Sequence, residues 1–182
     1  MVLLNSSSCN LDWQPNNFQF INLKGEKGSF YESFDSNGLL AMFICNHCPY
    51  VRSIENKIAN ETKRLKDLNV NSIAFMSNDQ NSYEEDHNKF LLEQISRAKF
   101  EFEYIVDTSQ SIAKTFDAQC TPEFYFFNHD KKLKYRGRLD SNGKVSSMGK
   151  PELYSAVEEI IAKGYCSSQQ YPSMGCSIKW KN

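Results

Sequence analysis

Six cysteines are the residues best suited to chemistry in this chain of 182 residues, and two of them form a Cys-x-x-Cys pair. The pair is Cys45 and Cys48, separated by Asn46 and His47. Residues three apart in the first turn of a helix face the same side, so the two sulfur atoms can meet and close a disulfide. The N-terminus of a helix also favours a thiolate over a thiol, because its N–H groups carry a positive partial charge. The spacing therefore predicts a redox-active dithiol.

The segments that flank this pair predict its place in the fold. Residues 39–44 form a short apolar run after Asn37-Gly38, which is typical of a buried strand. From Pro49 the apolar residues recur at helical spacing, and the first turn of a helix tolerates proline. We therefore place the pair where a strand hands over to a helix. We expect Cys45, nearer the exposed end, to attack a substrate and Cys48, one turn deeper, to resolve the mixed disulfide.

His47 lies between the two cysteines and is a candidate for tuning them. An imidazolium beside a thiolate stabilises it, which would lower the pKa of Cys45. The alternative is a solvent-facing loop histidine with little effect. Zinc is an alternative role for the whole motif, but a structural zinc site takes four ligands and the sequence has no second Cys-x-x-Cys motif. We therefore predict no metal site.

The rest of the chain alternates between strand-like and helix-like patterns. We predict strands near residues 18–21, 70–76, 104–106, 124–127 and 133–139, and helices over residues 83–98, 109–117 and 151–162. This order predicts an α/β fold, in which a central sheet with parallel strands has helices on both faces, a closing β-hairpin and a C-terminal helix. We expect one domain over residues 1–182, with residues 1–15 and 166–182 as irregular extensions.

Composition narrows the classes of partner and location. The formal net charge is −1, so the chain lacks the basic field that nucleic acids or anionic membranes attract. Its longest apolar run, residues 39–45, is too short to span a bilayer. The N-terminus has no basic leader, so we expect a cytoplasmic protein. In that reducing compartment cysteines serve more often as redox groups, metal ligands or packing residues than as structural disulfides. The oligomeric state is left open.

Five blocks of sequence, in a fixed order, carry a family resemblance. They are MFICNHCPYV at 42–51, Asn78-Asp79 with Tyr83 and Glu85-Asp86, CTPEF at 120–124, YRGRLD at 135–140, and GCSIKW at 175–180. With these blocks the chain resembles the thioredoxin superfamily, and more closely its peroxiredoxin-like redoxin branch of AhpC/TSA type. The resemblance covers residues 18–180. It implies a thioredoxin-like fold with a central mixed sheet, and a thiol–disulfide oxidoreductase that needs no cofactor and acts on protein or small-molecule thiols and disulfides.

The resemblance also assigns roles outside the Cys-x-x-Cys motif. Thr121-Pro122 falls where thioredoxin-like folds carry a cis-proline loop that faces the two cysteines, although the local sequence alone would favour a trans turn proline. There the backbone of Thr121 is expected to pair with an extended substrate segment. Cys120 is either a third redox thiol or a small buried hydrophobic residue, and Cys176 has the same two interpretations. Cys9 and Cys166 have no context that suggests chemistry.

The sequence also departs from its family in ways that leave other functions open. Peroxiredoxins place a threonine three residues before the reactive cysteine, whereas this chain has Met42 before Cys45. A thiol peroxidase is still the second candidate, with one cysteine oxidised to a sulfenate and the other resolving it. A metal-binding protein of the same fold is the third.

Thioredoxins often bury a carboxylate where this chain has Leu39, so proton transfer from Cys48 would need another group. Arg136 and Arg138 are expected on a solvated strand face. The acidic residues at 84–86 are expected at the start of a helix.

Overall fold

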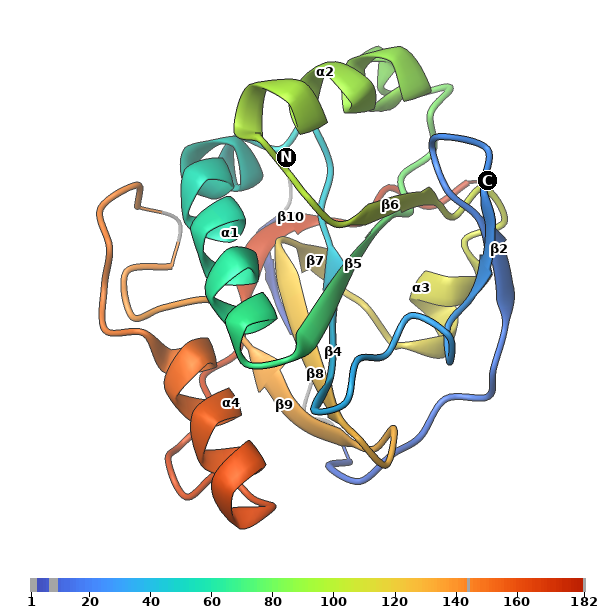
Figure 1. The fold of residues 1–182 in the computed structure, drawn as a ribbon. Coiled ribbons are helices and arrows are strands. Elements are labelled where there is room, and N and C mark those ends of the chain that lie inside the picture. The colour runs from blue at the N-terminus through green and yellow to red at the C-terminus, as the bar shows by residue number, and fades with distance from the viewer. Residues whose placement is uncertain (1–2, 7–9, 144, 182) are drawn as a thin grey trace.

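The computed structural model describes residues 3–6, 10–143 and 145–181. Its elements, in chain order, are β1 (Leu3–Asn5), β2 (Gln19–Ile21), β3 (Lys27–Ser29), β4 (Gly38–Phe43), α1 (Pro49–Asp67), β5 (Val70–Met76), η1 (Glu84–Asp86), α2 (Asn88–Ala98), β6 (Glu103–Val106), α3 (Ser111–Thr115), β7 (Cys120–Thr121), β8 (Glu123–Asn128), β9 (Leu133–Gly137), α4 (Glu152–Lys163) and β10 (Met174–Ser177). Figure 1 shows their arrangement around a twisted central sheet.

The central sheet is mixed, as predicted. Strands β4, β8 and β9 are antiparallel neighbours in that order, while β5 and β6 pair in parallel. The two groups meet where β4 and β5 lie side by side (Figure 1), and the N–H of Ile44 donates to the carbonyl of Phe75 at 3.1 Å. The β8–β9 pair is the predicted closing hairpin. Cys45 follows β4 directly, so this pairing fixes the start of the loop that carries the thiols.

Both faces of the sheet are buried, which explains why β4 is apolar at every position. Side chains alternate across a strand, so Leu40 and Met42 face one side and Leu39 and Phe43 the other. The first pair packs with residues of α1, α2 and α4, and the second packs with residues of α3 and an aromatic cluster. Helices therefore cover both faces, as predicted.

The tail is not the irregular extension expected from the sequence. Residues 174–177 form β10, which pairs antiparallel with β1 on one side and β7 on the other. The pairing depends on Gly175, because a Cβ atom there would lie 2.0 Å from the carbonyl oxygen of Thr121. Such a short strand without alternating apolar residues has no period that could have revealed it. The described part of the N-terminal extension likewise contains a strand, β1.

The helix expected over residues 83–98 is divided. Residues Glu84–Asp86 form a single 3₁₀ turn, and α2 begins only after His87, whose backbone is extended with ψ of 152°. The turn carries Asp86 into the interior, where it is fully buried.

The helix from 151 onwards ends at Gly164 in the left-handed conformation, as expected from the sequence. Among the described residues, no helix combines the length and apolar character that a membrane crossing requires.

Phe116 is the centre of the aromatic cluster behind the sheet. Its ring lies 5.3 Å from that of Trp13, 5.5 Å from Phe43 and 5.8 Å from Phe127, mostly edge to face. We predict that Phe116→Ala lowers the free energy of unfolding by about 3–5 kcal/mol, because a large buried ring is replaced by a cavity. Urea denaturation checks this. Leu92→Ala, at an exposed position of α2, is the control and should change the free energy of unfolding by less than about 0.5 kcal/mol. Equal losses of stability in the two variants would contradict the prediction.

Candidate active site

The loop between β4 and α1 carries both cysteines of the motif, at the strand-to-helix junction predicted from the sequence. Cys48 is the N-cap of α1, and Pro49 is the first helical residue. Cys45 therefore lies before the helix and not in its first turn, which corrects the expected position of the pair. Both side chains are buried, with 0% of each residue exposed. The helix terminus consequently acts on Cys48 more directly than on Cys45.

Three sulfur atoms and one threonine meet in this site. Cys45 Sγ lies 3.3 Å from the hydroxyl oxygen of Thr121, and Cys48 Sγ lies 3.3 Å from the carbonyl oxygen of the same residue. On its other side Cys48 Sγ lies 2.8 Å from Cys176 Sγ. No disulfide joins Cys45, Cys48 and Cys176. The tail thiol is thus part of the cluster, whereas the sequence left its role open.

The electrostatics of the site separate the two cysteines of the motif. A hydrogen bond from Cys45 is the main cause that lowers the pKa of Cys48 from 9.0 to about 5, and it outweighs the opposing effect of burial. The Cys176 thiol and the backbone amide of Val51 favour the same thiolate. Burial, the hydrogen bond with Cys48 and the charge of Asp86 raise the pKa of Cys45 well above 9.0. The charges around the pair therefore favour the thiolate on Cys48 over that on Cys45, whereas the sequence predicts attack by Cys45.

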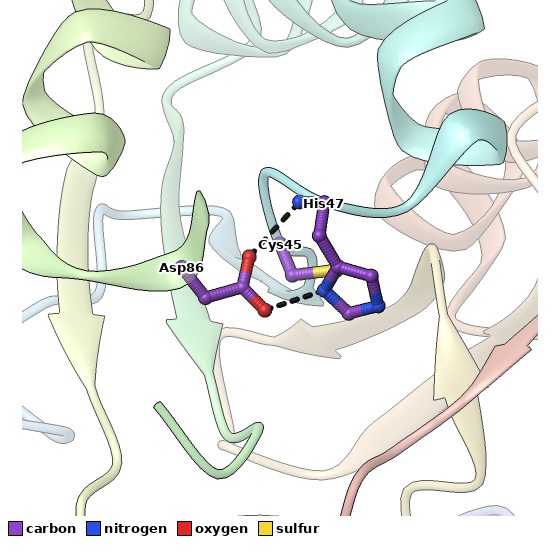
Figure 2. A group of neighbouring side chains, drawn as sticks. All are labelled: Cys45, His47 and Asp86. Carbon is purple, nitrogen blue, oxygen red and sulfur yellow. Dashed lines mark hydrogen bonds and ion pairs between the residues drawn. The ribbon is translucent and has the colours of Figure 1, made fainter. Parts of the chain in front are cut away.

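Asp86 fixes the loop between the cysteines. Its Oδ1 accepts the N–H of Asn46 at 2.8 Å and that of His47 at 3.0 Å. Its Oδ2 accepts hydrogen bonds from His47 Nδ1 at 2.6 Å and from the amide of Asn78 at 2.9 Å. Figure 2 shows the carboxylate facing both the backbone and the ring of His47, with Cys45 beside them. Sequence reasoning assigned Asp86 to a helix start, and nothing local distinguishes it from Glu84 or Glu85.

His47 is held by Asp86 and not by a thiolate. Its ring also stacks on Tyr83, with 4.2 Å between ring centroids, and its Nε2 is buried without a hydrogen-bond partner among the described residues. Donor atoms of Cys45, His47 and Asp86 lie within 4.8 Å of one another, the kind of cluster that can hold a metal. The four hydrogen bonds that Asp86 accepts already occupy its lone pairs. The group therefore fits a hydrogen-bonded Asp–His dyad better than a metal site.

The Thr121–Pro122 peptide bond is cis, as the family resemblance implied. Buried Glu123 holds this loop, since it accepts the N–H of Gln119 at 2.9 Å and a hydrogen bond from Arg136 at 2.8 Å. Arg136 is itself buried, so its expected place on a solvated strand face is wrong. The loop beside the thiols is therefore anchored by an internal ion pair.

The backbone edge of Thr121, expected to receive a substrate segment, is already occupied by the chain itself. In the antiparallel pairing of β7 with β10, Thr121 lies opposite Cys176. β10 therefore takes up one edge of β7, with which an extended substrate could otherwise pair. Beside this strand lies a groove of about 420 Å³, whose lining includes Pro122, Phe124 and Met174.

Cys120, the candidate third thiol, is separate from the cluster. It precedes Thr121 in β7, so its side chain points to the opposite face of the strand. Its sulfur lies 4.0 Å from the carbonyl oxygen of Pro122 and 3.9 Å from that of Ser173, and burial raises its pKa far above the usual value. These features fit the alternative of a small buried residue. Cys166 is half-buried near the surface, and Cys9 lies outside the described residues.

Comparison with known proteins places this geometry in a family. The model of the AhpC/TSA family matches residues 14–136. The chain belongs to the AhpC/TSA family. Two solved structures resemble it over nearly their whole length: an uncharacterized conserved protein from Geobacillus kaustophilus (TM-score 0.88, 31% identity, 100% of this chain and 97% of that one) and a hypothetical protein from Sinorhizobium meliloti 1021 (0.88, 30%, 97% and 98%).

A more distant match defines the fold of this AhpC/TSA family member. The thioredoxin domain of a thiol-disulfide oxidoreductase from Bacteroides vulgatus aligns with a TM-score of 0.63 at 17% identity, covering 85% of this chain and 99% of that one. The fold is thus thioredoxin-like, as the resemblance implied. No curated protein matches the sequence significantly.

We predict that the thiol of Cys45 sets the acidity of Cys48. Cys45→Ala should raise the pKa of Cys48 from about 5 towards its ordinary value of 9.0, because the main hydrogen bond to the thiolate is lost. Cys45→Ser keeps a donor of similar size and should leave a low pKa. The pH dependence of thiolate absorbance, with Cys48→Ser as the blank, measures both values. A low pKa in the alanine variant would show that the helix terminus, and not Cys45, stabilises the thiolate.

We predict that Asp86 makes stability depend on acid pH. Burial alone would raise its pKa, but the hydrogen bonds and charge of His47 hold it below the ordinary value of 3.8. A carboxylate whose pKa is lower in the folded than in the unfolded protein stabilises the fold at pH values above its unfolded-state pKa. This contribution disappears as the pH falls through its folded-state pKa. Asp86→Asn should therefore cost about 1–3 kcal/mol in free energy of unfolding at neutral pH. The difference from wild type should shrink as pH falls below the ordinary value of 3.8.

Urea denaturation of both proteins across this pH range measures the effect of Asp86. The exposed neighbour Glu85 provides the matched control, since Glu85→Gln removes an equal charge outside the buried network. If Asp86→Asn and Glu85→Gln have the same pH-dependent stability, the dyad does not stabilise the loop.

Proposed function

We propose that this protein is a thiol–disulfide oxidoreductase that cycles between a Cys45/Cys48 dithiol and a Cys45–Cys48 disulfide. The observation that carries the proposal is the pairing of a low-pKa Cys48, at the start of α1, with a second thiol that hydrogen-bonds to it. Membership of the AhpC/TSA family supports a redox enzyme in general terms. The proposed substrates are thiols and disulfides of proteins or small molecules.

The proposed reaction has two exchange steps. The Cys48 thiolate attacks one sulfur of a substrate disulfide, the substrate S–S bond breaks, and the other half leaves as a thiolate that takes up a proton. Cys45 then loses its proton, attacks Cys48 Sγ and expels the second half of the substrate. Two electrons pass from the protein to the substrate, and an external dithiol restores the pair. The same steps in reverse oxidise a dithiol substrate.

The first step prepares the second. The hydrogen bond and the charge of Cys48 are among the causes that raise the pKa of Cys45. Both disappear once Cys48 is held in a mixed disulfide, so Cys45 ionises more easily at the step that needs its thiolate. The charge of Asp86 opposes ionisation of Cys45 throughout, and a protonated His47 reduces that opposition by neutralising Asp86. We assign His47 this indirect tuning role.

Thr121 and Pro122 act in this proposal as the frame of the site. The hydroxyl of Thr121 contacts Cys45 and its carbonyl contacts Cys48, so one residue sets the distance of both sulfurs from the loop. Since neither cysteine is exposed, a substrate reaches Cys48 only after local movement of the chain around it. The cytoplasmic location and the single domain stay predictions.

We predict that Cys48 is the attacking residue. At neutral pH a thiol with a pKa above 9 is less than about 1% ionised, so Cys45 contributes little thiolate. Cys48→Ser should therefore lose adduct formation with glutathione disulfide by at least about tenfold, whereas Cys45→Ser should form the adduct and retain it longer than wild type. Mass spectrometry of the acid-quenched, alkylated protein identifies the modified cysteine. Normal adduct formation in Cys48→Ser, together with its loss in Cys45→Ser, would reverse the assignment.

A thiol peroxidase is the second candidate, and one contact favours it. The threonine hydroxyl that the sequence lacks before Cys45 is supplied in space by Thr121, which contacts Cys45 and also favours the thiolate of Cys48. In this reaction the Cys48 thiolate would take one oxygen from a peroxide, and Cys45 would convert the sulfenate to a disulfide with release of water. Stopped-flow oxidation by hydrogen peroxide tests this. A rate like that of a free thiol of equal acidity would exclude it, and a faster rate that falls in Thr121→Val would support it.

A further inference from the structure

Cys176 occupies a position that the Cys45–Cys48 cycle does not explain. It comes from β10, far along the chain, yet its sulfur lies 2.8 Å from Cys48 Sγ. This is closer than ordinary packing but well beyond the length of a disulfide bond, about 2.05 Å, so the two sulfurs are in contact and not bonded. Cys176 is also fully buried, so the contact is not a surface accident.

The strand that carries Cys176 lies where an extended substrate was expected. Cys176 is directly opposite Thr121 in the antiparallel pairing of β10 with β7. Gly175 lets the two backbones approach, because a Cβ atom there would overlap the carbonyl oxygen of Thr121. The chain thus presents its own sulfur to Cys48 from the edge at which a partner's sulfur would be presented.

We propose that Cys176 is a second resolving thiol, which forms a disulfide with Cys48 in place of Cys45. The inference rests on the proposed function, because it requires a mixed disulfide on Cys48. Cys176 loses its proton and attacks Cys48 Sγ, the bond from Cys48 to the substrate breaks, and the substrate leaves as a thiolate that takes up the proton. The Cys48–Cys176 disulfide then holds the two oxidising equivalents until an external dithiol reduces it.

The charges around Cys176 suit this step. Burial, then the hydrogen bond and charge of Cys48, raise the pKa of Cys176 to about 12, while the positive charge of Lys179 acts in the opposite direction. In the mixed disulfide Cys48 has no charge and no thiolate that accepts a hydrogen bond. Two of the three causes that raise the pKa of Cys176 are then gone, while Lys179 still lowers it. Cys176 therefore becomes easier to ionise only after Cys48 has reacted.

Cys120 provides a matched control. It is as completely buried as Cys176, and it lies beside Thr121 in β7. Its sulfur contacts carbonyl oxygens of the loop and not Cys48. A general effect of removing a buried thiol should therefore appear in Cys120→Ser, whereas a redox effect should appear only in Cys176→Ser.

The test follows resolution of the glutathione adduct on Cys48. The reduced Cys45→Ser protein and the Cys45→Ser/Cys176→Ser double variant are treated with glutathione disulfide, quenched with acid, alkylated and mapped by mass spectrometry. The single variant should release glutathione at least about tenfold faster than the double variant and should yield a Cys48–Cys176 disulfide. Cys45→Ser/Cys120→Ser should behave like the single variant. Urea denaturation confirms that each variant is folded before comparison.

The outcomes separate this inference from the proposed function. Equal release rates in the single and double variants, with no Cys48–Cys176 disulfide, would overturn the role of Cys176. If the Cys176→Ser protein nevertheless forms the Cys45–Cys48 disulfide, the proposed function stands and only the role of Cys176 is lost. If wild type forms no intramolecular disulfide at all, the proposed function fails and the inference fails with it.

Discussion

The Asp86 carboxylate is charged, fully buried and surrounded by hydrogen-bond donors from the loop that carries the thiols. A charge in the interior is costly unless each of its lone pairs is satisfied. Here the donors are the backbone of residues 46 and 47, the ring of His47 and the amide of Asn78. The loop therefore cannot change shape without leaving the carboxylate unsatisfied. This constraint holds Cys45 before the helix and leaves Cys48 at the helix N-terminus, within reach of the Cys45 hydrogen bond that is the main cause of its low pKa.

The sheet and the site are coupled through alternation in a single strand. Side chains on one face of β4 pack with residues of α1, α2 and α4 and with the cysteines. Side chains on the other face pack with the aromatic cluster around Phe116. The thiols thus sit at the end of a strand buried on both sides. A position of this kind allows little backbone movement at the motif.

Local patterns were enough to predict the framework. The apolar run before Cys45, the helical spacing after Pro49 and the Gly164 cap are each visible within a few residues, and the structure has all three. The cis bond at Pro122 needed the family resemblance, because the local sequence alone suggests a trans proline. The attack by Cys45 expected from the sequence stays a prediction, and the structure adds that Cys48 and not Cys45 is the N-cap of α1.

The remaining parts of the site depend on contacts that no local pattern can reveal. Asp86 reaches the loop across about 40 positions of sequence, and it resembles its acidic neighbours in every respect except burial. The tail strand has neither a hydrophobic period nor a turn signal, and only its pairing with β1 and β7 makes it a strand. Cys120 and Cys176 were indistinguishable as sequence, since what separates them is the face of the sheet on which each side chain lies.

The distance along the chain between Cys48 and Cys176 has a consequence for how the protein is made. The two residues are 128 positions apart, and contacts of such long range form late because a large loop must close first. Until β10 docks, a partly folded chain exposes Cys48 without its cover. A thiol that the native fold buries completely is then accessible, so cross-linking to other chains is a hazard of assembly and not of the native state.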